Sequence, residues 1–275
     1  MDQYAHDIPS PVDAYETVFV PAMLDPLARA AMDHIDARQG ARALDLACGT
    51  GIVARRLAPV LGADGAIVAV DISAEMLAKA RALPAPDGAP IEWREDDATA
   101  LDLPEGTFDI VVCQQSLQYM SDRPAVAAEC RRMLADGGRA ILSVWRALEH
   151  SPLFRELVEV EARHLGKLGV TYEELAAPFL MDSAEELHDL LAAAGFRQIA
   201  VNELAIEARF PSAASFVRDV EIAYASVMPQ FVQDPGAFED FVRKVEHDMR
   251  APVKRWRDGD GVRFPMKTHI ATASR

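Results

Sequence analysis

The sequence predicts an α/β fold in which a mostly parallel sheet carries helices on both faces. Between residues 42 and 145, apolar segments of strand length alternate with segments of helical periodicity. Such alternation requires parallel strands that are joined by crossover helices. Residues 110–113 are apolar at every position, which is typical of a strand buried on both faces.

The elements of this core follow one another in a regular order. Residues 12–38 are expected to form a first helix, because Leu27, Ala31 and Ile35 recur at helical spacing. Ser73 is expected to cap the helix that follows the second strand. Strands are predicted at residues 42–47, 67–71, 91–95, 108–113 and 139–145, and helices at residues 52–61, 74–83 and 122–134.

The second half of the chain adds helices to this core. Pro152 is expected to open one helix. Ser183 and Glu186 have the spacing of a capping box at the start of another, which Gly195 is expected to end. Further elements are predicted as a strand at residues 198–210, helices near residues 212–228 and 236–249, and a last strand at residues 262–273.

These elements predict one domain over residues 1–275. Additions to a parallel core usually lie over the ligand crevice at the carboxyl ends of the strands, so we expect the helical insertions to form a lid. The predicted parts are an N-terminal helical cap (1–40), a cofactor-binding core (41–150), two helical lid insertions (151–182 and 212–256) and the remainder of the sheet (183–211 and 257–275).

Composition narrows the class of protein. The chain has 28 Lys and Arg against 43 Asp and Glu, a net charge of −15, which disfavours nucleic acid as the main partner. The three cysteines are widely spaced, which predicts neither a disulfide framework nor a zinc site. With no secretory signal and no apolar run near the roughly 20 residues of a membrane span, we expect a cytoplasmic protein without membrane insertion. A homodimer is left open.

The most informative segment joins the first predicted strand to the helix after it, at residues 44–51. Gly49 and Gly51 allow the backbone to approach a ligand closely, and the following helix offers free N–H groups to an anionic group. Asp71 ends the next strand, where a carboxylate can accept both hydroxyls of a ribose. The spacing also permits a dinucleotide fingerprint that ends at Ala54, so a nicotinamide cofactor stays open at this point.

The same segment, Leu-Asp-Leu-Ala-Cys-Gly-Thr-Gly, resembles motif I of the class I S-adenosylmethionine-dependent methyltransferases. The resemblance is strong over residues 40–146, and residues 70–77, 95–98 and 106–111 look like the next elements of that family in order. Residues 133–139 look like the Leu-x-Pro-Gly-Gly turn, with Asp136 at the proline position. The chain looks like the small-molecule enzymes related to ubiquinone and menaquinone biosynthesis. This implies a Rossmann-like sheet of seven strands, in which the last strand is antiparallel.

The resemblance also implies which residues bind the cofactor, S-adenosyl-L-methionine, and its product S-adenosyl-L-homocysteine. Asp45 would bind the amino group of the methionine part, Asp71 the ribose, and Asp97 the amino group of adenine. Local helix or turn capping is the alternative for Asp45 and Asp97, and core packing is an equal alternative for Met76. The full predicted set is Asp45, Ala47, Gly49, Gly51, Asp71, Ile72, Met76, Asp97, Ala98, Gln114 and Leu117.

The methyl acceptor is expected to be a small organic molecule. Gln118, Tyr119 and His150 are the candidate catalytic residues, and His150 is the best formal base because its ordinary pKa lies near neutrality. Tyr15 and Trp145 are candidate substrate-binding residues, and simple packing is the alternative for all five. No histidine spacing indicates a metal site, and the residues after the fourth strand lack the motifs of nucleic-acid methyltransferases.

Three functions are therefore weighed. The first is methyl transfer from S-adenosylmethionine by in-line displacement to an oxygen, nitrogen or carbon atom. The second is an NAD(P)-dependent oxidoreductase, which is disfavoured because no Tyr-x-x-x-Lys pair accompanies the turn. The third is a protein that binds the cofactor without transferring the methyl group.

Overall fold

A computed structural model describes residues 10–166, 169–224 and 235–275 of the chain. These residues form two compact units, which are described separately here. The core unit consists of Leu27–Ala147, Pro178–Ala205 and Lys267–Arg275. The helical unit consists of Met1–Pro26, Leu148–Ala177 and Ile206–Met266. The prediction of a single domain stays a prediction, although most of both expected insertions falls in the helical unit.

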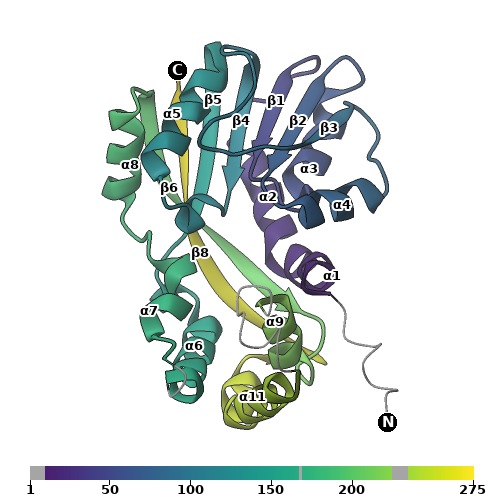
Figure 1. Ribbon diagram of the computed structural model, residues 1–275, viewed down its shortest axis with the longest axis vertical. Helices are drawn as coiled ribbons and strands as arrows, with labels where there is room; N and C mark the ends of the chain where they lie inside the picture. The colour runs from purple at the N-terminus through teal and green to yellow at the C-terminus, as the bar shows by residue number, and fades with distance from the viewer. Residues whose placement is uncertain (1–9, 167–168, 225–234) are drawn as a thin grey trace. The chain divides into compact units, whose positions relative to one another are not determined.

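The core unit is built on the predicted α/β sheet. Figure 1 shows β5, β4, β1, β2 and β3 side by side, and the full strand order is β3-β2-β1-β4-β5-β8-β6. The first five strands run parallel and β8 is antiparallel to β5, as the family resemblance implies. The strands are β1 (Arg42–Leu46), β2 (Ala66–Asp71), β3 (Ile91–Glu95), β4 (Phe108–Gln114), β5 (Leu134–Trp145), β6 (Arg197–Phe210) and β8 (Gly261–Ser274).

Hydrophobic clusters cover both faces of this sheet. Val111 and Cys113 of β4 face the cluster that includes α5 and α8, whereas Ile110 and Val112 face the cluster that includes α3. This alternation explains why the strand is apolar at consecutive positions. The helices of the core unit are α2 (Asp25–Met32), α3 (Ile52–Leu61), α4 (Ala74–Ala82), α5 (Arg123–Met133) and α8 (Ala184–Ala193), with a short 3-10 helix η2 (Leu117–Tyr119) after β4.

Two local expectations need correction. The helix predicted over residues 12–38 ends at Met32 and contains a π-helical stretch, η1 (Tyr15–Leu24), that includes Pro21. Proline lacks the N–H that an α-helical bond would require, which favours an irregular turn at this point. The capping box predicted for α8 forms in one direction only in the described bonds, because Ser183 Oγ accepts from Glu186 N.

The helical unit has its own aromatic core. Phe154, Phe210, Phe216 and Phe264 pack mainly edge to face, and Phe210 stacks on Phe264 with ring centroids 6.0 Å apart. The elements of this unit include α1 (Pro11–Ala14), η3 (Leu148–His150), α6 (Pro152–Leu165), α7 (Tyr172–Leu175), α9 (Phe216–Tyr224), α11 (Pro235–Asp248), α12 (Arg250–Arg255) and β7 (Arg257–Asp258). Among the described helices of the chain, none has the length and apolarity needed to cross a membrane.

Candidate cofactor site

The glycine-rich turn after β1 has the backbone geometry that a close ligand requires. Gly49 and Gly51 have φ angles of +56° and +82°, and Ala47 also lies in the left-handed region at +53°. A Cβ on Gly51 would stand 2.2 Å from the ring of Trp93, so no other residue fits there without displacing that ring. Gly51 is the N-cap residue of α3 and has no side chain to cap it, which leaves N–H groups of the first turn for a ligand.

Asp45 lies beneath this turn and is only 1% exposed. Its Oδ2 accepts a hydrogen bond of 2.9 Å from Ala54 N in α3. Burial raises the pKa of Asp45 to about 7; the charge of Asp71 acts in the same direction, whereas the bond from Ala54 opposes the shift. A buried carboxyl group of this kind favours a cationic partner, because the positive charge would stabilise its ionised form.

Asp71 links the end of β2 to the turn. Its Oδ2 accepts from Gly49 N at 2.7 Å, and its Oδ1 accepts from Ser73 N at 2.9 Å. Each carboxylate oxygen can accept more than one hydrogen bond, so both can still receive a hydroxyl of a ribose. Ser73 caps α4 as predicted, with Oγ accepting from Met76 N at 3.3 Å.

Two apolar side chains and a further acid follow the strands at the same edge of the sheet. Ile72 comes directly after β2 and is 72% exposed, while Met76 is half-buried. Asp97 follows β3 and is exposed, and its Oδ1 accepts from the amide and the hydroxyl of Thr99 at 2.8 Å each. These bonds lower the pKa of Asp97 and keep its carboxylate ionised. Ala98 packs against the core beside it.

The segment after β4 is held against the glycine-rich turn. Ser116 Oγ lies 3.1 Å from Ala47 O and 3.0 Å from Gln114 O, and its single hydroxyl hydrogen is shared between these two carbonyls. Gln114 and Leu117 lie on either side of Ser116 in the sequence. Gln114 ends β4 and is half-buried, whereas Leu117 is fully buried in the hydrophobic core. Core packing is therefore what the structure shows for Leu117, and its contact with the cofactor stays a prediction.

The candidates for acceptor chemistry are divided between the two units. The core unit contains Gln118, which is buried, Trp145, which ends β5 and is also buried, and Tyr119. The side chain of Tyr119 is 59% exposed as a whole, but desolvation at its hydroxyl raises the phenol pKa to about 12. The phenol is therefore protonated at pH 7.

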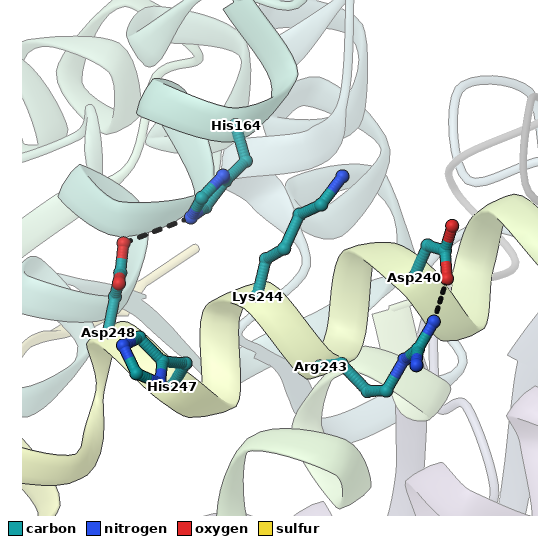
Figure 2. Close-up of a pocket in the computed structure, with 6 residues that line it drawn as sticks. All are labelled: His164, Asp240, Arg243, Lys244, His247 and Asp248. Atoms are coloured by element: carbon teal, nitrogen blue, oxygen red, sulfur yellow. Dashed lines mark hydrogen bonds and ion pairs between the residues drawn. The ribbon is translucent and has the colours of Figure 1, made fainter.

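The helical unit contains the other two candidates. His150 ends η3 and is half-buried. Tyr15 begins η1 and packs edge to face on Phe19, with ring centroids 6.1 Å apart. Figure 2 shows a pocket in this unit that is lined by residues of α6 and α11, where His164 Nε2 lies 3.1 Å from Asp248 Oδ2. None of the residues drawn there belongs to the predicted site.

The cysteines have a structural role. Burial raises the pKa of the Cys113 thiol to about 12, and it raises the pKa values of Cys48 and Cys130 as well, so all three thiols are neutral. Within residues 10–166, 169–224 and 235–275, no three His, Cys, Asp or Glu side chains gather into a possible metal site.

Sequence reasoning missed three residues that shape this region. Trp93 lies mid-strand and gives no local sign that it covers Gly51. Ser116 anchors the segment after β4, and a small polar residue next to a strand end is only a weak signal. Thr268 bonds to Gln115 across 153 residues of sequence, which no local pattern could indicate.

The site fits an adenosyl cofactor that carries an amino acid. Thr50 Oγ1, in the glycine-rich turn, is buried and has no hydrogen-bond partner in the described part of the chain. A cofactor that donates to or accepts from this hydroxyl would remove that deficit. The exposed Ile72 offers an apolar surface for a base, and Asp45 and Asp71 offer carboxylates for an ammonium group and a ribose.

Comparison with known proteins supports the same conclusion. The family model described as a methyltransferase domain matches residues 43–138. The 2-phytyl-1,4-naphtoquinone methyltransferase of Thermosynechococcus vestitus is 36% identical over 153 residues, which cover 53% of this chain and 67% of that protein. The nocamycin O-methyltransferase of Saccharothrix syringae is 32% identical over 204 residues, which cover 70% of this chain and 72% of that protein.

Two further matches complete the comparison. The ubiquinone biosynthesis O-methyltransferase of Xanthomonas oryzae is 30% identical over 141 residues, but the match covers only 56% of that protein and 50% of this chain. The phosphoethanolamine N-methyltransferase 2 of Haemonchus contortus, solved with S-adenosylhomocysteine, has the same fold at 17% identity. Its TM-score is 0.58, with 96% of this chain and 56% of that chain covered.

The nicotinamide alternative is not favoured by any of these relatives, and S-adenosylmethionine is the cofactor that the family uses. Fold, turn and relatives thus lead to one conclusion: the chain belongs to the small-molecule branch of the class I S-adenosylmethionine-dependent methyltransferases.

Proposed function

We propose that this protein transfers the methyl group of S-adenosylmethionine to an oxygen atom of a small organic acceptor. The observation that carries the proposal lies at the carboxyl ends of the parallel strands. There, hydrogen bonds bring Asp45, Asp71 and the segment after β4 together at one glycine-rich turn. The oxygen acceptor is supported by the names of two relatives, the nocamycin and ubiquinone biosynthesis O-methyltransferases.

We propose for the individual residues the cofactor-binding roles that the family resemblance implies, and this arrangement supports them. Asp45 binds the ammonium group of the methionine part and Asp71 the ribose hydroxyls, since charge-assisted hydrogen bonds suit both groups. Ile72 and Met76 enclose the adenine, and Asp97 with Ala98 binds its amino group. The turn residues Ala47, Gly49 and Gly51 allow close approach, while the Gln114 backbone and Leu117 border the methyl group.

The bound cofactor supplies an electrophilic methyl group on a sulfonium. The chain aligns the acceptor with it and excludes water, which is where most of the rate enhancement of a displacement originates. A residue that holds the acceptor oxygen in line with this methyl group would promote the displacement, in which the carbon–oxygen bond would form as the carbon–sulfur bond breaks with its electron pair left on sulfur. The acceptor proton must then leave, and His150 is the candidate base because an imidazole ring nitrogen can accept a proton. Tyr119, Gln118, Trp145 and Tyr15 are the candidates for orienting the acceptor.

The proposal is tested by transfer of a labelled methyl group. The purified chain is incubated with tritiated S-adenosylmethionine and a panel of phenols, hydroquinones and enols, alongside amines of similar size. Label is expected in the methyl ether of at least one hydroxylated compound. Transfer to the amines alone would contradict the oxygen assignment, and tight cofactor binding without any transfer would favour a non-catalytic protein.

The role of Asp71 is tested separately by calorimetry. Asp71→Ala should weaken S-adenosylmethionine binding by roughly 1–3 kcal/mol, because charged hydrogen bonds to the cofactor are lost. Asp87→Ala, which removes an exposed carboxylate from the loop before β3, is the control and should leave affinity unchanged. Since Asp71 also holds Gly49, thermal unfolding of both variants is measured in parallel. Equal affinities for the two variants would show that Asp71 does not bind the cofactor.

A further inference from the structure

The segment that follows β4 contains two glutamines whose buried side chains form a hydrogen-bond chain with Thr268 of β8. Gln118 Nε2 donates to Gln115 Oε1 at 3.1 Å, and Gln115 Nε2 donates to Thr268 Oγ1 at 2.8 Å. Ser143 of β5 lies at the edge of this network, 3.4 Å from the same Gln115 nitrogen. All four side chains are at most 7% exposed.

The direction of this hydrogen-bond chain is fixed at its inner end. Thr268 Oγ1 donates to the main-chain carbonyl of Val144 at 2.6 Å, and its other neighbour, the carbonyl of His269 at 3.1 Å, is also an acceptor. A carbonyl can only accept, so the single hydrogen of the hydroxyl is used there. Thr268 must therefore accept from the Gln115 amide nitrogen, and Gln115 must present its oxygen to Gln118.

This direction leaves Gln118 Oε1, at the other end of the hydrogen-bond chain, free to accept a hydrogen bond. With Nε2 of Gln118 committed to Gln115, its Oε1 is the remaining group, and this atom is buried without a partner among the residues that the structure describes. An unpaired buried acceptor destabilises the folded state, and each such group in a native protein calls for an explanation, of which a role at a binding or catalytic site is one.

Backbone strain at the same place is a second, independent observation. Gln115 has a φ of +54°, a left-handed conformation that is strained for a residue with a Cβ. Strain of this kind concentrates at ligand-binding positions. The neighbouring Ser116 lies within hydrogen-bond distance of Ala47 O in the cofactor turn, and Gln118 follows Ser116 by two residues in the sequence.

We propose that Gln118 Oε1 accepts a hydrogen bond from the O–H of the methyl acceptor, and that Thr268 and Gln115 are positioning residues that fix the orientation of its amide. This inference rests on the proposed transfer to oxygen. It defines the substrate class further: the acceptor binds as the neutral alcohol or phenol, because a carbonyl oxygen attracts a hydroxyl hydrogen and repels a phenolate.

The inference is tested with the best hydroxylated acceptor from the labelling panel. Gln118→Met keeps the size of the side chain but removes the acceptor atom, and it should lower kcat/KM for this acceptor at least tenfold. Thr268→Val frees the Gln115 amide to reverse and should raise the acceptor KM severalfold, whereas Thr268→Ser should restore it. Gln39→Met makes the same chemical change at an exposed position and should be silent.

Cofactor affinity distinguishes the remaining explanations. Calorimetry with S-adenosylhomocysteine should give the same Kd within twofold for wild type and Gln118→Met. A tenfold loss of this affinity with an unchanged acceptor KM would show that Gln118 binds the cofactor, and unchanged kinetics in both variants would show that its oxygen is satisfied otherwise. Either result would overturn the proposal.

Failure of the labelling panel is a different result, and the inference can still be tested then. Phenol and anisole are titrated onto the complex with S-adenosylhomocysteine, and the side-chain amide signals of Gln118 and Gln115 are followed by NMR. A shift with phenol that anisole does not cause supports the hydrogen bond. Equal shifts, or none, would overturn it.

Discussion

At the scale of single residues, the proposed contact of Asp45 with the cofactor should make cofactor binding depend on pH. Its pKa of about 7 in the folded protein means that the carboxyl is half-protonated near neutrality. A cationic cofactor beside it favours the ionised form, so binding should release a proton. We expect the affinity for S-adenosylmethionine to rise about tenfold from pH 6 to pH 8, the range over which a group with this pKa ionises.

Calorimetry in two buffers of different ionisation enthalpy measures this proton release directly. Asp45→Asn has no carboxyl to ionise, so its weaker affinity should be nearly independent of pH over the same range. If the wild-type affinity is equally flat, Asp45 does not face the positive charge of the cofactor.

Gly51 offers a second prediction at this scale. Gly51→Ala places a methyl group against Trp93 in a backbone conformation with a φ of +82°, and the free energy of unfolding should fall by about 2 kcal/mol or more. In a Trp93→Ala background the added methyl group no longer meets the indole ring. Gly51→Ala should therefore lower the free energy of unfolding by less in that background than in the wild type, because only the strained φ remains. Gly166→Ala is the control, since Gly166 has a helical φ of −57° and open space around it, and its effect should be within about 0.5 kcal/mol.

At the scale of elements, two acids buried in the helical unit make its stability depend on pH. Glu161 of α6 and Glu221 of α9 interact with each other and are both at most 5% exposed. Burial raises the pKa of Glu161 to about 7, and burial together with the charge of Glu161 raises the pKa of Glu221 well above its ordinary value. The folded protein thus prefers the protonated acids, so stability should fall as the pH rises from about 4.5 through 7.

Glu221→Gln should reduce this loss, because the amide is neutral and can still donate to Glu161. Thermal unfolding between pH 5 and pH 8 should show a drop in wild-type stability that exceeds the drop of the variant by about 1 kcal/mol or more. Asp45 adds a loss of the same sign in both proteins. Glu159→Gln, at an exposed position of the same helix, should follow the wild type. Parallel curves for all three proteins would mean that the pair does not titrate.

The sequence predicted elements well where one local pattern decided them. The bounds of α3 and β3 agree with the prediction, because a clear apolar period lies between strong turn residues in each case. The first helix was misjudged since its apolar spacing does not report the effect of Pro21 on the turns around it. In the site, Asp71 and Gly49 could be predicted from a known motif, whereas the contact between Thr268 and Gln115 depends on strand order and could not.

At the scale of the whole molecule, the last strand should be essential for folding. Residues 268–274 of β8 pair with β5 over seven consecutive positions, and β8 also separates β5 from β6. Deleting residues 267–275 exposes both strand edges, so we expect an insoluble or unfolded protein by circular dichroism and size exclusion. A chain that ends at Ser274 loses the bond from the Arg275 side chain to Leu134 O and the bond of 3.4 Å from Arg275 N to Gly138 O, but it keeps the pairing of β8 with β5, and it is the control. A folded product from the longer deletion would contradict this role.

The place of β8 in the strand order also constrains how the protein is made. β6 (Arg197–Phe210) reaches the rest of the sheet only through β8 (Gly261–Ser274). Since β6 comes earlier in the sequence, it is synthesised well before the strand that it must pair with. During translation the nascent chain must carry an incomplete sheet, whose open strand edges are prone to aggregation until residues 268–274 emerge. A tether that leaves residues 1–210 outside the ribosome should therefore prolong an aggregation-prone intermediate, whereas a tether that leaves residues 1–275 outside should not.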